Sequence, residues 1–145
     1  MPYILPHARA RLDSGDSPTT SGELNYAISA AIVKELVMHL GWKGELSYGK
    51  MNFIVGALEE LKASLYHPEI NTNRFINKIH HLCVEYLNNT TEENIVTNTI
   101  GALENAKDEF RRRIQHPYED KKMRKNGDIY TELLSGIATL PMGDD

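Results

Sequence analysis

The densest run of chemically active side chains in this 145-residue chain lies between Glu109 and Asn126. Guanidinium forks and lysine ammonium groups bind phosphate oxygens, and a tyrosine ring offers a surface for stacking. The pattern predicts a binding site for a small phosphorylated or nucleotide-type ligand. We expect the site to consist of Arg111, Arg112, His116, Tyr118, Lys121 and Lys122.

The same segment has a simpler interpretation as a solvated helix end. Cations there would complement the negative end of the helix dipole, and the residues alone leave both interpretations open. Binding of a nucleic acid is not expected, because the net charge of the chain is −4 and carboxylates such as Glu119 and Asp120 interrupt the cations. A compact anion suits such a mixed surface better than a duplex does.

An enzymatic alternative is a helical, Mg²⁺-dependent nucleotide pyrophosphohydrolase, which holds its metal with carboxylates on facing helices. The available carboxylates are Glu59, Glu60, Glu104, Asp108 and Glu109. They lack the paired three-residue spacing of such enzymes, and Glu59 with Lys62 and Glu104 with Lys107 have the spacing of salt bridges within one helix. The six histidines are scattered, so we expect no catalytic residue, no metal site and no cofactor.

Hydrophobic spacing predicts an all-α fold. Residues 1–20 are expected to form an extended arm and loop, residues 21–67 a first helical hairpin, residues 71–116 a second hairpin, and residues 117–145 a basic, partly helical segment and tail. Capping boxes, Thr20 with Glu23 and Thr90 with Glu93, should open one helix in each hairpin. The second helix of each hairpin should end before a proline, Pro68 or Pro117. Asn126-Gly127-Asp128 should form a stop and turn after the basic segment.

The two predicted hairpins echo one another in sequence. Val55-Gly56-Ala57-Leu58-Glu59 with Lys62 reappears 45 positions later as Ile100-Gly101-Ala102-Leu103-Glu104 with Lys107. An isolated hairpin cannot bury its apolar stripe, so we expect the two to form a four-helix arrangement within one domain. Gly56 and Gly101 are the expected points of close helix approach.

The remaining composition is that of an ordinary globular chain, 41% apolar and 25% charged. No apolar run approaches the length of a membrane span, and the N-terminus has no signal-like segment, so we expect a cytoplasmic protein without membrane contact. Cys83, the single cysteine, falls on an apolar stripe and is expected to be a buried structural thiol. The apolar arm and hairpin stripe favour a homo-oligomer.

Three groups of residues carry a resemblance to a known family. They are Gly22-Glu23-Leu24-Asn25-Tyr26-Ala27-Ile28; Ile100-Gly101-Ala102-Leu103-Glu104 with Lys107, Glu109-Phe110 and Arg112-Arg113; and Pro117-Tyr118-Glu119-Asp120-Lys121-Lys122 followed by Asn126-Gly127-Asp128-Ile129-Tyr130. The chain resembles small uncharacterised proteins of tailed bacteriophages and bacteria, which also tend to begin Met-Pro-Tyr-Ile. The resemblance implies no reaction, but it favours a small accessory protein, including one that counters host defence.

We therefore predict a non-enzymatic phage or bacterial accessory protein that binds, and could sequester, a small anionic ligand at its basic C-terminal region. A helical protein-interaction adaptor is the first alternative, in which the basic segment only aids solubility. The Mg²⁺-dependent pyrophosphohydrolase is the second.

Overall fold

The computed structural model describes residues 3–42, 46–65 and 73–139, and these residues are helical or loop with no β-strand. The all-α prediction is confirmed. The helices are α1 (Pro6–Asp13), α2 (Ser21–Met38), α3 (Tyr48–Ser64), α4 (Arg74–Asn89), α5 (Ile95–Phe110), the π-helical turn η1 (Arg111–Gln115), α6 (His116–Asn126) and α7 (Ile129–Thr139). No helix in the described part of the chain is long and apolar enough to cross a membrane.

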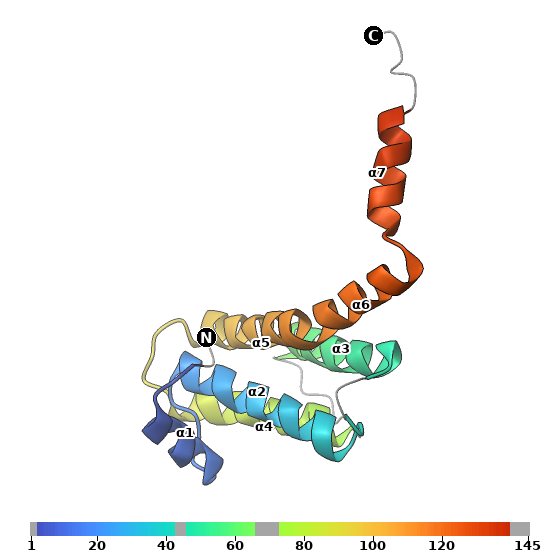
Figure 1. The fold of residues 1–145 in the computed structure, drawn as a ribbon. Helices are drawn as coiled ribbons and strands as arrows, with labels where there is room; N and C mark the ends of the chain where they lie inside the picture. The colour runs from blue at the N-terminus through green and yellow to red at the C-terminus, as the bar shows by residue number, and fades with distance from the viewer. Residues whose placement is uncertain (1–2, 43–45, 66–72, 140–145) are drawn as a thin grey trace, which may run out of the picture.

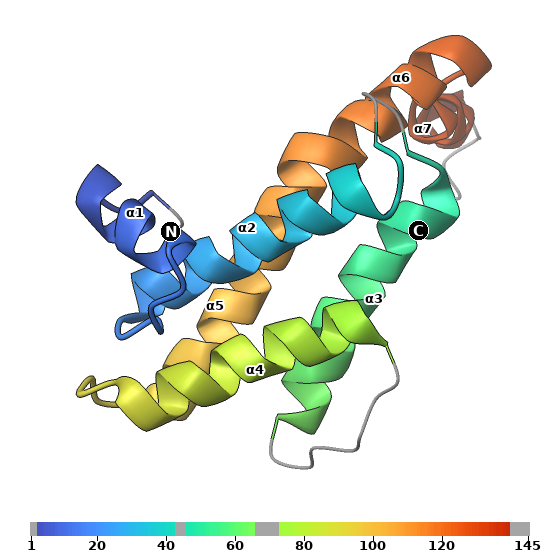
Figure 2. The ribbon, with the colours of Figure 1, turned by 90° about the horizontal axis from the view of Figure 1, so that it is seen from below.

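Helices α2, α3, α4 and α5 form the body of the molecule (Figures 1 and 2). Helix α2 packs mainly on α5 and then on α4, while α3 packs mainly on α5. Their apolar stripes meet in one core, in which Leu24, Ile28, Leu58, Ile79 and Leu103 are completely buried. The four-residue spacing of Leu24, Ile28, Ile32 and Leu36 along α2 therefore marks the face that the core covers.

The arrangement of two self-contained hairpins is not confirmed. Within the described residues, the chain neighbours α2 and α3 make few direct contacts, whereas α2 and α5, which are distant in sequence, share the largest interface. An amphipathic stripe predicts which face of a helix is buried, but it does not predict which other helix covers that face. The predicted helix end at His67-Pro68 lies outside the described residues.

Of the two predicted capping boxes, the first is half formed and the second is not formed. The Thr20 side chain accepts a hydrogen bond from the Glu23 backbone N–H at 3.1 Å and caps α2, although the Glu23 carboxylate accepts from Thr19 N–H at 3.0 Å instead of from Thr20. Thr90 ends α4, and α5 begins after Asn94, whose φ of 55° is left-handed. The prediction of a cap at Thr90 and Glu93 was wrong because Thr90 Oγ1 donates to the Thr19 carbonyl at 2.8 Å, tying this loop to the start of α2.

The predicted N-terminal arm is shorter than expected, since residues 6–13 form helix α1. Pro6 occupies the start of α1, where a missing backbone N–H costs nothing and the fixed φ angle favours the helix. A salt bridge of 2.5 Å between Arg11 and Glu23 joins α1 to α2. The Tyr26 hydroxyl adds a second connection by donating to the Asp13 carboxylate at 3.0 Å. Of the described residues, only 3–5 remain an extended arm.

The predicted helix end before Pro117 was also wrong, because the chain stays helical from Ile95 to Asn126. In η1 the backbone widens, and the His116 N–H donates to the carbonyl of Arg111, five residues earlier. Pro117 then lies in the first turn of α6, where its missing N–H is tolerated. The π-helical turn thus accommodates a proline that would otherwise break the helix. The predicted stop at Asn126-Gly127 is confirmed, since α6 ends there and Gly127 has a φ of 95°.

Four charged side chains of the repeated sequence form a network between α3 and α5, which we call the charge square. Glu59 and Lys62 of α3 correspond to Glu104 and Lys107 of α5. Lys107 Nζ lies 2.5 Å from Glu59 and 2.8 Å from Glu104, while Lys62 Nζ contacts Glu104 and lies 3.6 Å from Glu59. The predicted salt bridges within each helix are present, and the structure adds the two that cross between helices.

The close helix approach predicted at Gly56 and Gly101 is absent. A Cβ atom built on either residue would meet no atom within 4 Å apart from its own helix. The repeated glycines do not mediate the contact between α3 and α5, and the repeated charges lie at that contact instead.

We expect truncation of the core to lower the free energy of unfolding strongly. Leu58 is completely buried, so Leu58→Ala should cost about 2–5 kcal/mol through lost burial and a new cavity. Leu5→Ala makes the same chemical change at a residue that is 65% exposed and should cost less than ~0.5 kcal/mol. Chemical denaturation measures both values, and equal losses would contradict the core described above.

The charge square should make stability depend on pH. Hydrogen bonds from Lys107 and Lys62 lower the pKa of Glu104, and a hydrogen bond from Lys107 lowers that of Glu59. A carboxyl with a lowered folded-state pKa stabilises the fold above its unfolded pKa, and this contribution disappears as the pH falls through the folded value. Glu104→Gln should therefore destabilise the protein at pH 7 by less than roughly 1 kcal/mol, because these groups are solvated, and should have little effect at pH 2. Glu93→Gln, which changes an exposed carboxylate outside the charge square, is the control and should change the stability little at pH 7.

Candidate ligand-binding site

Both arginines of the predicted site form hydrogen bonds within their own helical segment. Arg111 Nε donates to Gln115 Oε1 at 3.0 Å. Arg112 Nη2 donates to both carboxylate oxygens of Glu109, at 2.9 and 3.0 Å. Neither arginine lines a described pocket, so the structure does not bring them together with the other predicted residues.

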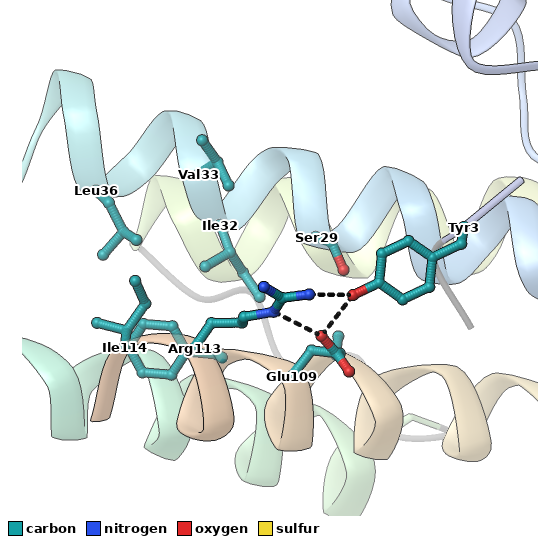
Figure 3. A pocket seen from close by; sticks show the side chains of 10 residues that line it. Tyr3, Ser29, Ile32, Val33, Leu36, Glu109, Arg113 and Ile114 are labelled. Atoms are coloured by element: carbon teal, nitrogen blue, oxygen red, sulfur yellow. Dashed lines mark hydrogen bonds and ion pairs between the residues drawn. The ribbon is translucent and has the colours of Figure 1, made fainter. Parts of the chain in front are cut away.

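Arg113, rather than Arg111 or Arg112, lies with the predicted residues Tyr118 and Lys121. Its Nη2 donates to the Tyr3 hydroxyl at 3.0 Å, and its Nε lies 3.7 Å from Glu109 Oε2. The Tyr3 hydroxyl in turn donates to Glu109 Oε2 at 3.0 Å (Figure 3). Arg113 therefore joins the N-terminal arm to the end of α5, and it lines two pockets.

The first of these pockets, which we call the Trp42–Tyr118 pocket, has a volume of about 230 Å³. Its lining is mainly apolar with two cations: Trp42, Leu46, Met51, Arg113, Ile114, Pro117, Tyr118 and Lys121. Of the predicted site residues, Tyr118 and Lys121 line this pocket. His116 is exposed on α6 and does not line it.

The Tyr118 ring interacts with two neighbouring side chains, Tyr48 and Lys122. The centroid of the Tyr48 ring lies 6.4 Å away at an interplanar angle of 33°. Lys122 Nζ lies 5.7 Å from the Tyr118 centroid, within reach of a cation–π interaction. Lys122, the last of the predicted residues, thus lies over the Tyr118 ring and does not line the pocket.

The second pocket, which we call the α2–α5 groove, has a volume of about 200 Å³. It is lined by Tyr3, Ser29, Ile32, Val33, Leu36, Ala106, Glu109, Phe110, Arg113 and Ile114. Figure 3 shows the polar cluster of Tyr3, Glu109 and Arg113 at one side of the aliphatic side chains. Partial burial alone would raise the pKa of Glu109, but hydrogen bonds from Arg112 and Tyr3 and the charges of Arg112 and Arg113 lower it overall.

Trp42 and Arg113 are among the six lining residues of the Trp42–Tyr118 pocket that sequence reasoning missed. Trp42 is the single tryptophan of the chain and follows Gly41, a residue type that often comes directly after a helix, and this signal could have been used. Arg113 could not be separated from Arg111 and Arg112, because the direction of each side chain depends on the π-helical turn. A regular helix and a π-helical turn rotate three consecutive side chains by different amounts.

Three of the five carboxylates considered for metal-dependent catalysis have basic or hydroxyl partners. Glu59 and Glu104 bind the lysines of the charge square, and Glu109 binds Arg112, Arg113 and Tyr3. Within the described ranges, no three His, Cys, Asp or Glu side chains gather in a way that could hold a metal ion.

Glu23 and Tyr26 of the Gly22–Ile28 motif join α2 to α1 and the loop that follows it. Burial raises the pKa of Glu23, but hydrogen bonds from Thr19 and Arg11 outweigh it and lower the pKa overall. Tyr26 binds Asp13 of α1, and Asn25 is almost completely buried. This motif therefore docks α1 and the following loop on α2, away from the Trp42–Tyr118 pocket.

Comparison with known proteins yields one family. The model of a domain of unknown function, DUF6899, matches residues 1–76 and 68–129. No curated protein and no solved structure matches the chain. The matched ranges include α1 to α6 and all the residues that line the Trp42–Tyr118 pocket.

Cys83 should be inert in the folded protein. Burial raises the pKa of its thiol to about 12, so almost no reactive thiolate exists near neutral pH, and the side chain is completely buried. We expect an aromatic disulfide reagent at pH 8 to label Cys83 only as fast as the protein opens, and immediately in denaturant. Rapid labelling under native conditions would contradict the buried position.

Proposed function

We propose that this chain, which belongs to the DUF6899 family of a domain of unknown function, binds a small nucleotide-type ligand in the Trp42–Tyr118 pocket. The observation that carries the proposal is the composition of the pocket. Aromatic and aliphatic walls from Trp42, Tyr118 and Ile114 stand beside two cations, Arg113 and Lys121. A nucleotide has the matching parts, a flat base and an anionic phosphate group.

The walls and the cations have separate roles in this proposal. A base gains from stacking on an aromatic ring and from leaving water, whereas phosphate oxygens gain from guanidinium and ammonium donors. The pocket volume of about 230 Å³ is below the roughly 300–1,000 Å³ typical of sites that enclose a whole drug-sized ligand. We therefore expect the base to enter the pocket and the phosphates to stay near Arg113 and Lys121.

The proposed role is retention of the ligand without chemical change. None of the described residues that line the pocket is a carboxylate, so the pocket is better suited to hold an anion than to hold Mg²⁺ for hydrolysis. The biological setting is also part of the proposal. We infer an accessory protein of a bacteriophage or bacterium that acts in the cytoplasm, where sequestering a signalling nucleotide would counter a host response.

Ligand binding should depend on two cations and not on their neighbours. In a thermal-shift screen against mono-, di- and cyclic nucleotides, we expect at least one to raise the melting temperature in a concentration-dependent way. Lys121→Ala should weaken binding of that nucleotide about 10-fold or more, because it removes a charge-assisted contact. Arg113→Ala should do the same, and calorimetric titration measures both.

The chain provides matched controls for these variants. Arg112→Ala removes the adjacent arginine, which binds Glu109 and does not line the pocket, and Lys125→Ala removes a lysine from the last turn of α6. Both should retain the wild-type affinity. Absence of any thermal shift would contradict the proposal and favour the protein-interaction adaptor, while recovery of a hydrolysed ligand would favour the enzyme.

A further inference from the structure

Helix α7 carries an apolar face that no other described element covers. Its large apolar residues follow the spacing i, i+1, i+4, i+5 and i+8, which places them within one arc of a helix. Each is more than half exposed: Ile129, Tyr130, Leu133, Leu134 and Ile137. The polar residues Thr131 and Ser135 lie on the opposite side.

Helix α7 is a separate element with a defined start. Asp128 Oδ1 accepts hydrogen bonds from the backbone N–H groups of Tyr130 and Thr131, at 3.0 and 3.2 Å, and so caps the first turn. The only charged residue of the helix is Glu132, and its carboxylate lies so close to Gly127 that a Cβ there would meet Oε1 at 2.9 Å. That carboxylate is therefore turned toward the joint with α6.

Helix α6 is a poor surface on which α7 could fold back. None of the described residues of α6 is buried, and its sequence is dominated by charge, with Met123 as its single exposed large apolar side chain. Figure 1 shows α6 and α7 leading away from the four-helix body. The apolar face of α7 would meet carboxylates and lysines if the two helices closed on each other.

A surface of matching chemistry exists on the body of the molecule. The α2–α5 groove is concave and almost entirely apolar, apart from its cluster of Tyr3, Glu109 and Arg113. On α2 the exposed apolar surface includes Val33, Val37 and Met38, which are 57%, 53% and 70% exposed. The described residues thus include a convex apolar helix face and an apolar groove, and no other described element covers either of them.

We propose that α7 of one copy of this chain packs in the α2–α5 groove of a second copy, and that the second copy returns the same contact. Such an exchange is a closed two-fold arrangement, in which each copy uses the same pair of surfaces. It accounts for both exposed surfaces with one partner, whereas pairing α7 with α7 would leave the groove open.

The available area favours the exchange over simple pairing of two α7 helices. If each exposed side chain contributes roughly 100 Å² of accessible surface, the α7 stripe presents on the order of 500 Å². Two such contacts bury both stripes, about 1,000 Å², together with the surface of two grooves and the exposed Val37 and Met38 of α2, which brings the total into the range of about 1,200–2,000 Å² for stable interfaces. Two stripes against each other bury only about 1,000 Å².

Sedimentation equilibrium of the full-length chain tests the exchange. The wild type should be a dimer, and Leu133→Glu should raise its dissociation constant at least ~10-fold by placing a charge in the apolar stripe. Val33→Glu should have a similar effect from the groove. Ser135→Glu adds the same charge on the other side of α7 and should leave the dimer intact. Circular dichroism checks that each variant retains its helices.

Mixing the two interface variants distinguishes exchange from other arrangements. A Val33→Glu copy retains an intact α7 and a Leu133→Glu copy retains an intact groove, so their mixture should associate more strongly than either variant alone. A wild-type monomer at all concentrations would overturn the proposal. So would a Val33→Glu variant that remains fully dimeric, because that result indicates pairing of α7 with α7. Nucleotide binding is measured separately and can fail independently.

Discussion

The packing of α2 against α5 is the contact on which the other features of this molecule depend. These helices are distant in sequence, yet they share the largest interface of the body. Their junction forms the α2–α5 groove, and it places the N-terminal arm where Tyr3 can reach Glu109 and Arg113. The interface also fixes the direction in which α5 continues into η1 and α6. Loss of this packing would therefore remove the groove and misplace one wall of the Trp42–Tyr118 pocket.

The π-helical turn η1 links the two proposed surfaces. Arg113 and Ile114 line both the Trp42–Tyr118 pocket and the α2–α5 groove. The Arg113 guanidinium binds the Tyr3 hydroxyl and lies near the Glu109 carboxylate, so an anion in the neighbouring pocket would compete with the N-terminal arm for one side chain. Because a π-helical turn also accommodates Pro117, a single departure from regular helix geometry determines both the continuity of the helix and the placement of this arginine.

The charge square shows that the two copies of a repeated sequence contact each other in the folded protein. Glu59 and Lys62 recur as Glu104 and Lys107, and α3 and α5 meet so that each lysine contacts carboxylates of both helices. Single exposed ion pairs contribute little to stability, but four charges in one network fix the register of two helices against each other. The repeated glycines, which are equally visible in sequence, have no comparable role at the interface.

Features that depend on nearby residues were determined by the sequence alone. Apolar spacing identified the core face of α2, Thr20 and Glu23 marked its start, and Asn126-Gly127 marked the end of α6. These signals operate within one or two helical turns, so they can be read without knowing the fold. The tertiary structure decided which helices pair and which cations share a pocket. Arg113 rather than Arg111 or Arg112 lies beside Trp42 and Tyr118, because that position depends on α2, α5 and the π-helical turn together.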